Sequence, residues 1–150
     1  MMIDLPDVNV IVALLDAEHQ FHREAMAWFR EARQKGWATC PLTENGTIRV
    51  LSPPQYPGLR ISVSQAAELL RALVRSSASS HVFWQDSLSI LNETVYDLGM
   101  LQGYGQITDI YLLGLCQHNG GTLVTMDKGV VVLAQRMCAE RLDLVKRIGD

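Results

Sequence analysis

The sequence predicts an α/β protein, in which a mainly parallel sheet of four to five strands lies between two layers of helices. Short apolar runs typical of buried strands alternate along the chain with longer segments of helical periodicity, and parallel strands require such crossovers. In addition, 48% of the 150 residues are hydrophobic, which is enough apolar material for one core. We therefore expect a single domain spanning residues 1–150, with a three-layer α/β/α architecture.

The strands are predicted from short apolar runs bounded by polar residues, glycine or proline. They lie at residues 2–5, 37–40, 81–85, 122–126 and 142–145. The third of these follows a serine-rich linker, SSASS, and the fifth is the shortest. Because helical segments separate all of them, each strand is expected to run parallel to its neighbours.

The helices are predicted from apolar residues that recur at helical spacing. They lie at residues 9–15, 19–33, 41–51, 62–77, 88–98, 106–121 and 127–137. Ser64 is expected to cap the fourth helix and Thr108 the sixth, which is apolar on nearly every side and should be buried. The segment SPPQYPGLR, between the third and fourth helices, reads as a loop.

Charge and cysteine content exclude several classes of protein. The net charge is −3, so the chain has no broad basic surface of the kind that binds nucleic acid without help. Cys40, Cys116 and Cys138 are odd in number and share no CxxC spacing. They are expected to be reduced thiols in the core of a cytoplasmic protein, rather than a disulfide framework or a zinc site. The apolar stretches are too short to cross a bilayer.

Four acids fall at equivalent places in this predicted fold. Asp7 follows the first strand and Asp127 follows the fourth, while Glu44 and Asp109 lie in the first turns of two helices. Strand carboxyl ends and the helix amino ends that follow them share one edge of a parallel sheet, and this edge is where open sheets bind ligands. The four carboxylates are therefore expected to converge.

Each acid alone has an ordinary structural explanation, because carboxylates cap helices and favour the first helical turn. Together they are harder to explain. Two carboxylates ~4 Å apart repel by about 4 kcal/mol at an effective dielectric constant of 20. Oxygen ligands without cysteine or histidine suit a hard cation, so the set predicts Mg²⁺ or Mn²⁺. Such a site is suited to hydrolysing a phosphodiester.

Four blocks of the sequence carry a resemblance to a known family. The blocks are PDVNVIVALL, CPLTENGTIRVLS, QITDIYLLGLC and GGTLVTMDKGV. In order and spacing they resemble the acidic motifs of the PIN-domain nucleases, and the HQFHREAMAWF segment is most similar to the VapC-type toxins of toxin–antitoxin pairs. The resemblance implies a Mg²⁺-dependent endoribonuclease and toxin that forms homodimers and is inhibited by a VapB-like antitoxin.

The resemblance also assigns roles to individual residues. The acids that match the family's four acidic positions are Asp7, Glu44, Asp109 and Asp127. Asp7 and Asp109 are expected to ligate the metal directly, whereas Glu44 and Asp127 act through water or through a second ion. Asn9 matches the polar partner in the first block, and Thr108 matches the hydroxyl residue before the third acid.

Other functions remain open at this point. A PIN-like nuclease could process RNA without any antitoxin. A receiver domain would need two acids after the first strand and an acceptor aspartate after the third, and a haloacid-dehalogenase-like phosphatase would need DxD where this chain has PDVN. His19 and His22 have a spacing compatible with a metal pair but no third ligand nearby, so we assign them to the surface or to a partner contact. Trp28, Trp37 and Trp84 are assigned to the core and the subunit interface.

Overall fold

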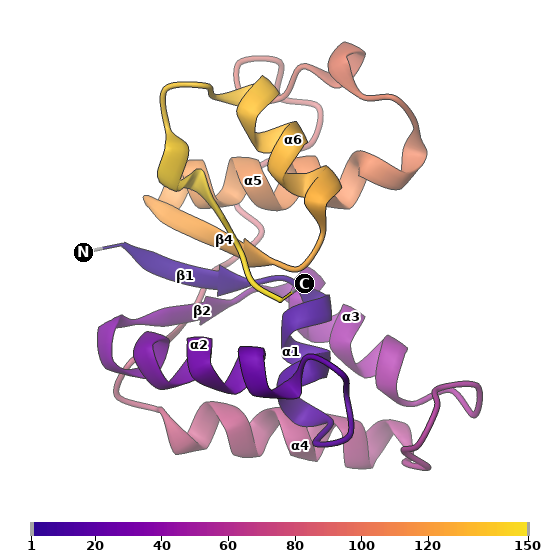
Figure 1. The fold of residues 1–150 in the computed structure, drawn as a ribbon. Helices are drawn as coiled ribbons and strands as arrows, with labels where there is room; N and C mark the ends of the chain where they lie inside the picture. Colours follow the sequence, from indigo (N-terminus) through magenta and orange to yellow (C-terminus); the bar gives the residue numbers. More distant parts are fainter. Residues whose placement is uncertain (1, 150) are drawn as a thin grey trace.

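The computed structural model describes residues 2–149 and confirms the predicted three-layer α/β/α fold (Figure 1). The five strands are β1 (Ile3–Pro6), β2 (Trp37–Thr39), β3 (His81–Phe83), β4 (Gly121–Thr125) and β5 (Val145–Arg147). They form one sheet in the order β3-β2-β1-β4-β5, and every neighbouring pair is parallel. The central strand is therefore the first one in the chain.

In the described part of the chain, six α-helices cover the two faces of the sheet. They are α1 (Val8–Leu15), α2 (His22–Lys35), α3 (Pro41–Leu51), α4 (Val63–Ser76), α5 (Ile107–Asn119) and α6 (Lys128–Met137). Figure 1 shows α5 and α6 on one side of the sheet and α1 to α4 on the other. Within residues 2–149, no helix is long and apolar enough to cross a membrane.

Successive side chains along the strands point alternately into two hydrophobic cores, one on each face of the sheet. Leu5, Ala38 and Leu123 point into the core formed with α5 and α6, whereas the neighbouring Trp37 and Val124 point into the core formed with α1 and α2. Side chains on successive strand residues face opposite sides of a sheet, so buried strands with helices on both faces read as continuous apolar runs. Trp28 and Trp84 are also buried, which agrees with their predicted place in the core.

The predicted helix at residues 88–98 is wrong. This segment is a series of turns that ends in the short 3₁₀ helix η1 (Leu98–Met100). Ser89 Oγ accepts from the Leu91 amide at 3.1 Å, and Asn92 Oδ1 accepts from the Thr94 amide at 3.0 Å. Such local side-chain bonds compete with helical ones, while the apolar residues of the segment still pack on the core.

Three smaller predictions also need correction. Ser62, not Ser64, caps α4, because its hydroxyl and the Gln65 side chain three residues later form a capping box. Thr108 does not cap α5, which begins at Ile107 after Gln106. The fifth strand begins at Val145, since residues 142–144 form a 3₁₀ turn, η3 (Leu142–Leu144). All three cysteines are buried free thiols, as predicted.

Candidate active site

Asp7 lies at the carboxyl end of the central strand and is held there by three hydrogen bonds. Its amide donates to the Val124 carbonyl at 2.7 Å, which ties it to β4. Its Oδ1 accepts from the Val8 amide at 2.8 Å, so Asp7 is also the N-cap of α1. Its Oδ2 accepts from the Thr125 hydroxyl at 2.9 Å. The side chain is thus fixed in both position and orientation.

Burial raises the pKa of Asp7 above its ordinary value of 3.8. The hydrogen bonds from Thr125 and Val8 oppose this shift because they favour the ionised form, while the charge of Asp127 adds to it. A carboxylate only 9% exposed and beside another acid is costly to ionise. This position therefore favours a nearby cation.

Thr125, the last residue of β4, is the centre of a polar network that the sequence analysis did not identify. Its fully buried hydroxyl donates to Asp7 and accepts from the Asp127 amide at 3.1 Å and from Asn9 Nδ2 at 3.4 Å. Asn9 Oδ1 in turn accepts from the Met126 amide at 3.4 Å. The predicted supporting role of Asn9 thus has a structural counterpart: it joins α1 to the end of β4. A hydroxyl at the end of a buried strand, two residues before an acid, was the available signal.

Asp109 faces the same place from the first turn of α5. Burial raises its pKa to about 6, and the charges of Asp7 and Asp127 add to the shift. Within residues 2–149 no hydrogen bond or ion pair to its carboxylate is found, and Gln106 rather than Asp109 precedes the helix. A capping role therefore does not account for this acid.

Asp127 completes a cluster of three aspartates, which we call the aspartate cluster: Asp7, Asp109 and Asp127. Its Oδ1 accepts from the Gly129 amide at 2.7 Å, so Asp127 caps α6 as well as facing the other two acids. The three side chains come from the amino ends of α1, α5 and α6, which meet at the carboxyl edge of β1 and β4. The topology thus brings together three of the four acids that were expected to converge.

Glu44 is placed differently from the three aspartates. Its charge is not among those that raise the pKa of Asp7 or Asp109. Instead its Oε2 accepts from the Thr39 hydroxyl at 2.6 Å, and that hydroxyl lies 2.9 Å from His81 Nε2. The helix that carries Glu44, α3, nevertheless packs closely on α1. A Cβ atom added to Gly46 of α3 would lie only 2.7 Å from Val8 Cγ2 of α1, so the glycine allows this close approach. Glu44 therefore flanks the aspartate cluster rather than belonging to it.

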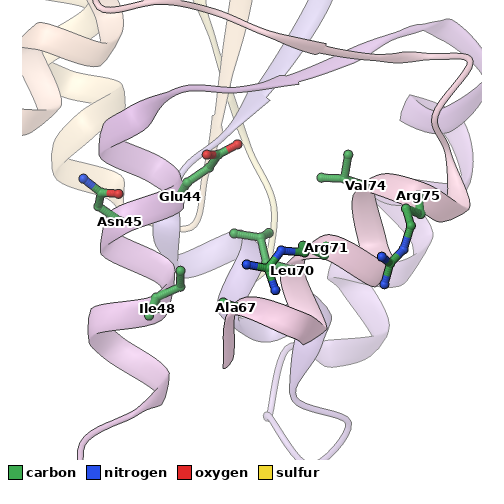
Figure 2. A pocket seen from close by; sticks show the side chains of 8 residues that line it. All are labelled: Glu44, Asn45, Ile48, Ala67, Leu70, Arg71, Val74 and Arg75. Atoms are coloured by element: carbon green, nitrogen blue, oxygen red, sulfur yellow. The ribbon is translucent and has the colours of Figure 1, made fainter. Parts of the chain in front are cut away.

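A groove of about 350 Å³ between α3 and α4 adjoins Glu44. In Figure 2 the Glu44 carboxylate extends from the first turn of α3, while Arg71 points from α4 toward α3. The apolar floor includes Ile48 and Leu70. Arg71 and Arg75 both form ion pairs with Glu68 on the exposed side of α4. One wall of this groove thus carries two arginines that are paired with Glu68, and the opposite wall carries Glu44, an acid of the predicted site.

The remaining predicted residues take peripheral places. Thr108 is exposed at the start of α5, beside Asp109. His22 Nδ1 lies 2.8 Å from the Ala13 carbonyl, and His19 Nδ1 accepts from the Phe21 amide at 3.0 Å. His22 thus joins α1 to the start of α2, whereas the bond of His19 lies within the connection between the two helices.

The aspartate cluster suits a hard divalent cation. Within residues 2–149, no three His, Cys, Asp or Glu side chains are arranged to enclose an ion on their own. Mg²⁺ commonly takes one or two carboxylates and completes its octahedron with water and substrate phosphate, so it does not need such an enclosure. Asp7 and Asp109 offer oxygen ligands whose mutual repulsion a cation would relieve. The donors fit Mg²⁺ or Mn²⁺.

Comparison with known proteins identifies the family of this fold. The PIN domain family model matches residues 5–135. The chain is 42% identical over 130 residues to Ribonuclease VapC44 of Mycobacterium tuberculosis, covering 87% of this chain and 89% of that protein. It is 39% identical over 132 residues to Ribonuclease VapC38 of the same organism, covering 88% and 90%. It is 32% identical over 126 residues to Ribonuclease VapC39, covering 84% and 89%. The chain belongs to the PIN-domain family, and its similar proteins are VapC ribonucleases.

Proposed function

We propose that this protein is a metal-dependent endoribonuclease and the toxin of a type II toxin–antitoxin pair, acting in the cytoplasm. The observation that carries the proposal is the aspartate cluster, in which burial and mutual repulsion raise the pKa of Asp7 and Asp109. The names of the similar proteins, all VapC ribonucleases, support an RNA substrate and a VapB-like antitoxin.

In this proposal Asp7 and Asp109 hold Mg²⁺ or Mn²⁺, and Asp127 and Glu44 contribute through water. When bound, the ion supplies Lewis acidity to the scissile phosphate and to the attacking water. Thr125 keeps the Oδ2 atom of Asp7 in place, and Asn9 holds Thr125 against α1. Asp109, with no described hydrogen bond of its own, is available to accept a bond from a water or to bind the ion.

The cluster also determines how RNA is bound. The protein carries a net charge of −3, so phosphate is repelled from this edge unless a cation is present. Arg71 and Arg75, which are exposed and paired with Glu68, line the groove beside Glu44 and would exchange this pairing for contacts with the RNA backbone. Metal and substrate are therefore expected to bind together.

The test is cleavage of single-stranded RNA by the purified protein with Mg²⁺, with Mn²⁺ and with EDTA. Wild type is expected to cleave only with a divalent ion, and Asp109→Asn to lose at least two orders of magnitude of activity. Glu31→Gln removes an exposed charge on α2 and serves as the control with unchanged activity. Cleavage that persists in EDTA would overturn the metal-dependent mechanism.

A second experiment separates a toxin from an RNA-processing nuclease without an antitoxin. Induced expression in bacteria is expected to arrest growth, and the Asp109→Asn variant is expected not to. Co-expression of a small DNA-binding protein encoded next to the gene should restore growth. A protein that cleaves RNA in vitro but leaves growth unaffected is a processing nuclease.

A further inference from the structure

The Glu44 carboxylate is the end of a hydrogen-bonded chain that begins on a different strand. Thr39 Oγ1 donates to Glu44 Oε2 at 2.6 Å and lies 2.9 Å from His81 Nε2. A threonine hydroxyl has one proton, and here that proton is given to the carboxylate. The second contact must therefore be a bond from His81 Nε2–H to the lone pair of Thr39. The hydrogen bonds therefore run from His81 to Thr39 and from Thr39 to Glu44.

The arrangement is built into the sheet. β2 and β3 pair in parallel with Trp37 opposite His81, which places the imidazole on the same side of the sheet as Thr39. The ring of His81 packs edge-on against Trp37, with centroids 4.7 Å apart. Thr39 is fully buried at the end of β2, and its carbonyl accepts from the Trp84 amide at 2.8 Å. Neither Thr39 nor His81 is held by an exposed loop.

The bond from Thr39 to Glu44 is not needed to start α3. Pro41 occupies the first turn, and Thr43 Oγ1 already accepts from the Cys40 amide at 3.0 Å as part of a capping box. The Glu44 amide bonds to the Cys40 carbonyl at 3.0 Å in the ordinary helical pattern. Thr39 therefore acts on the Glu44 side chain alone, and what it fixes is the direction of a carboxylate.

We propose that Thr39 and His81 are positioning residues for Glu44, holding Oε2 so that the carboxylate keeps one orientation for its part in the reaction. This inference rests on the proposed ribonuclease function, since it assigns Glu44 a part in that reaction. Burial lowers the pKa of His81 even though the charge of Glu44 opposes the shift. Nε2–H donates to Thr39 in the neutral Nε2–H tautomer and in the imidazolium alike, so the chain does not depend on the charge of His81.

Four variants test the hydrogen bonds one at a time. Thr39→Val removes the hydroxyl at nearly constant shape, whereas Thr39→Ser keeps it. His81→Phe removes the donor, whereas His81→Gln keeps an N–H near the place of Nε2. We expect Thr39→Val to lower kcat by about tenfold to a hundredfold with little change in KM, and His81→Phe to lower it less. Thr39→Ser and His81→Gln should retain most of the activity.

A matched control comes from α3, the helix that carries Glu44. Thr47 is also a fully buried threonine, and its hydroxyl donates only to the Thr43 carbonyl at 2.7 Å. Thr47→Val removes a buried hydroxyl from α3 without touching Glu44, so kcat should be unchanged. The melting temperature of each variant shows whether any loss follows from unfolding. If Thr39→Val fails to fold, His81→Phe and His81→Gln still compare a variant that loses the hydrogen bond with one that keeps it.

The decisive measurement is a double-mutant cycle with Glu44→Ala. If Thr39 acts through Glu44, Thr39→Val should have no further effect on kcat once Glu44 is absent. An equal loss in both backgrounds would overturn the positioning role, as would full activity in Thr39→Val alongside impaired activity in Glu44→Ala. Wild type that cleaves no RNA at any metal concentration would overturn the proposed function itself, and this assignment with it.

One readout does not depend on activity. Nitrogen-15 shifts of the His81 ring at neutral pH, without metal, should show a protonated Nε2 and an unprotonated Nδ1. Thr39→Val should perturb the Nε2 signal, and Thr47→Val should not. An Nδ1–H tautomer in the wild type would contradict the direction of the hydrogen-bonded chain.

Discussion

The Thr125 hydroxyl donates a hydrogen bond to Asp7 Oδ2 at 2.9 Å, and this bond joins residues 118 positions apart in the sequence. It connects the ends of two neighbouring parallel strands, β1 and β4. The same hydroxyl accepts from the Asp127 amide, so one threonine orders two acids of the aspartate cluster. Thr125 thereby links the architecture of the sheet to the geometry of the site.

Thr125→Val is therefore expected to reduce ribonuclease activity by about tenfold to a hundredfold, as losses of residues that orient metal ligands commonly do. The hydrogen bond lowers the pKa of Asp7, so the variant should also need a higher pH or more Mg²⁺ to reach its own maximal rate. Activity measured across Mg²⁺ concentration and pH checks both effects. Thr125→Ser is the control, and a valine variant with wild-type Mg²⁺ dependence would contradict the role.

Asp109→Asn is expected to stabilise the metal-free protein at neutral pH. The pKa of Asp109 rises from its ordinary 3.8 to about 6 on folding, so the folded state binds more protons and wild-type stability falls as pH rises through this interval. Asparagine does not ionise, so the variant does not lose stability as the pH rises through this interval. Because Asp109 is partly exposed, the difference above pH 6 should be on the order of 1 kcal/mol, and it should vanish below pH 3.8.

Denaturant unfolding in EDTA at several pH values measures that difference. Saturating Mg²⁺ should then raise the melting temperature of the wild type more than that of Asp109→Asn, because the variant has lost a ligand. The assignment of Asp109 to the metal site would be contradicted by an asparagine variant that is less stable than wild type in EDTA at pH 7.5 and whose melting temperature rises as much with Mg²⁺.

RNA is expected to bind weakly to the metal-free wild type. The net charge of −3 and the acidic edge both repel phosphate. Fluorescence anisotropy with labelled single-stranded RNA in EDTA at physiological salt should give a dissociation constant above 1 μM. Submicromolar binding under these conditions would mean that a basic surface, not the metal, dominates the affinity.

We also expect the protein to form a homodimer. Around the start of α5, the apolar side chains of Leu98, Tyr104 and Ile107 are 41%, 92% and 47% exposed, and apolar patches of this kind commonly mark subunit interfaces. Light scattering at micromolar concentration should give twice the 16.7 kDa of one chain. Tyr104→Asp should shift the equilibrium toward the monomer, and a wild type that is already monomeric would contradict the prediction.

The order of strands and acids along the chain was sufficient to predict which aspartates meet. Asp7, Asp109 and Asp127 lie directly after strands or in first helical turns, and a parallel sheet leaves few places for such residues. Glu44 met the same criterion but accepts a hydrogen bond from the Thr39 hydroxyl, which also contacts His81, instead of lying among the aspartates. The periodicity that located its helix does not determine the rotation of that helix about its axis.

The pairing of residues far apart in the sequence was harder to predict. Thr125 bonds to Asp7 across 118 residues and His81 contacts Thr39 across 42, and no local rule relates positions so far apart. The incorrect prediction of a helix at residues 88–98 has a local cause instead. Its apolar spacing suited a helix, but Ser89 and Asn92 bond to nearby amides and hold the segment in turns.

The central place of β1 has a consequence for protein synthesis. Residues 2–83 include three strands and four helices, but the residues that Asp7 meets at the site, Asp109, Thr125 and Asp127, all come later in the chain. A nascent chain that ends before Thr125 therefore carries no aspartate cluster, however well its first half has folded. In the proposed ribonuclease, the site is therefore completed only near the end of synthesis, after most of the chain has been made.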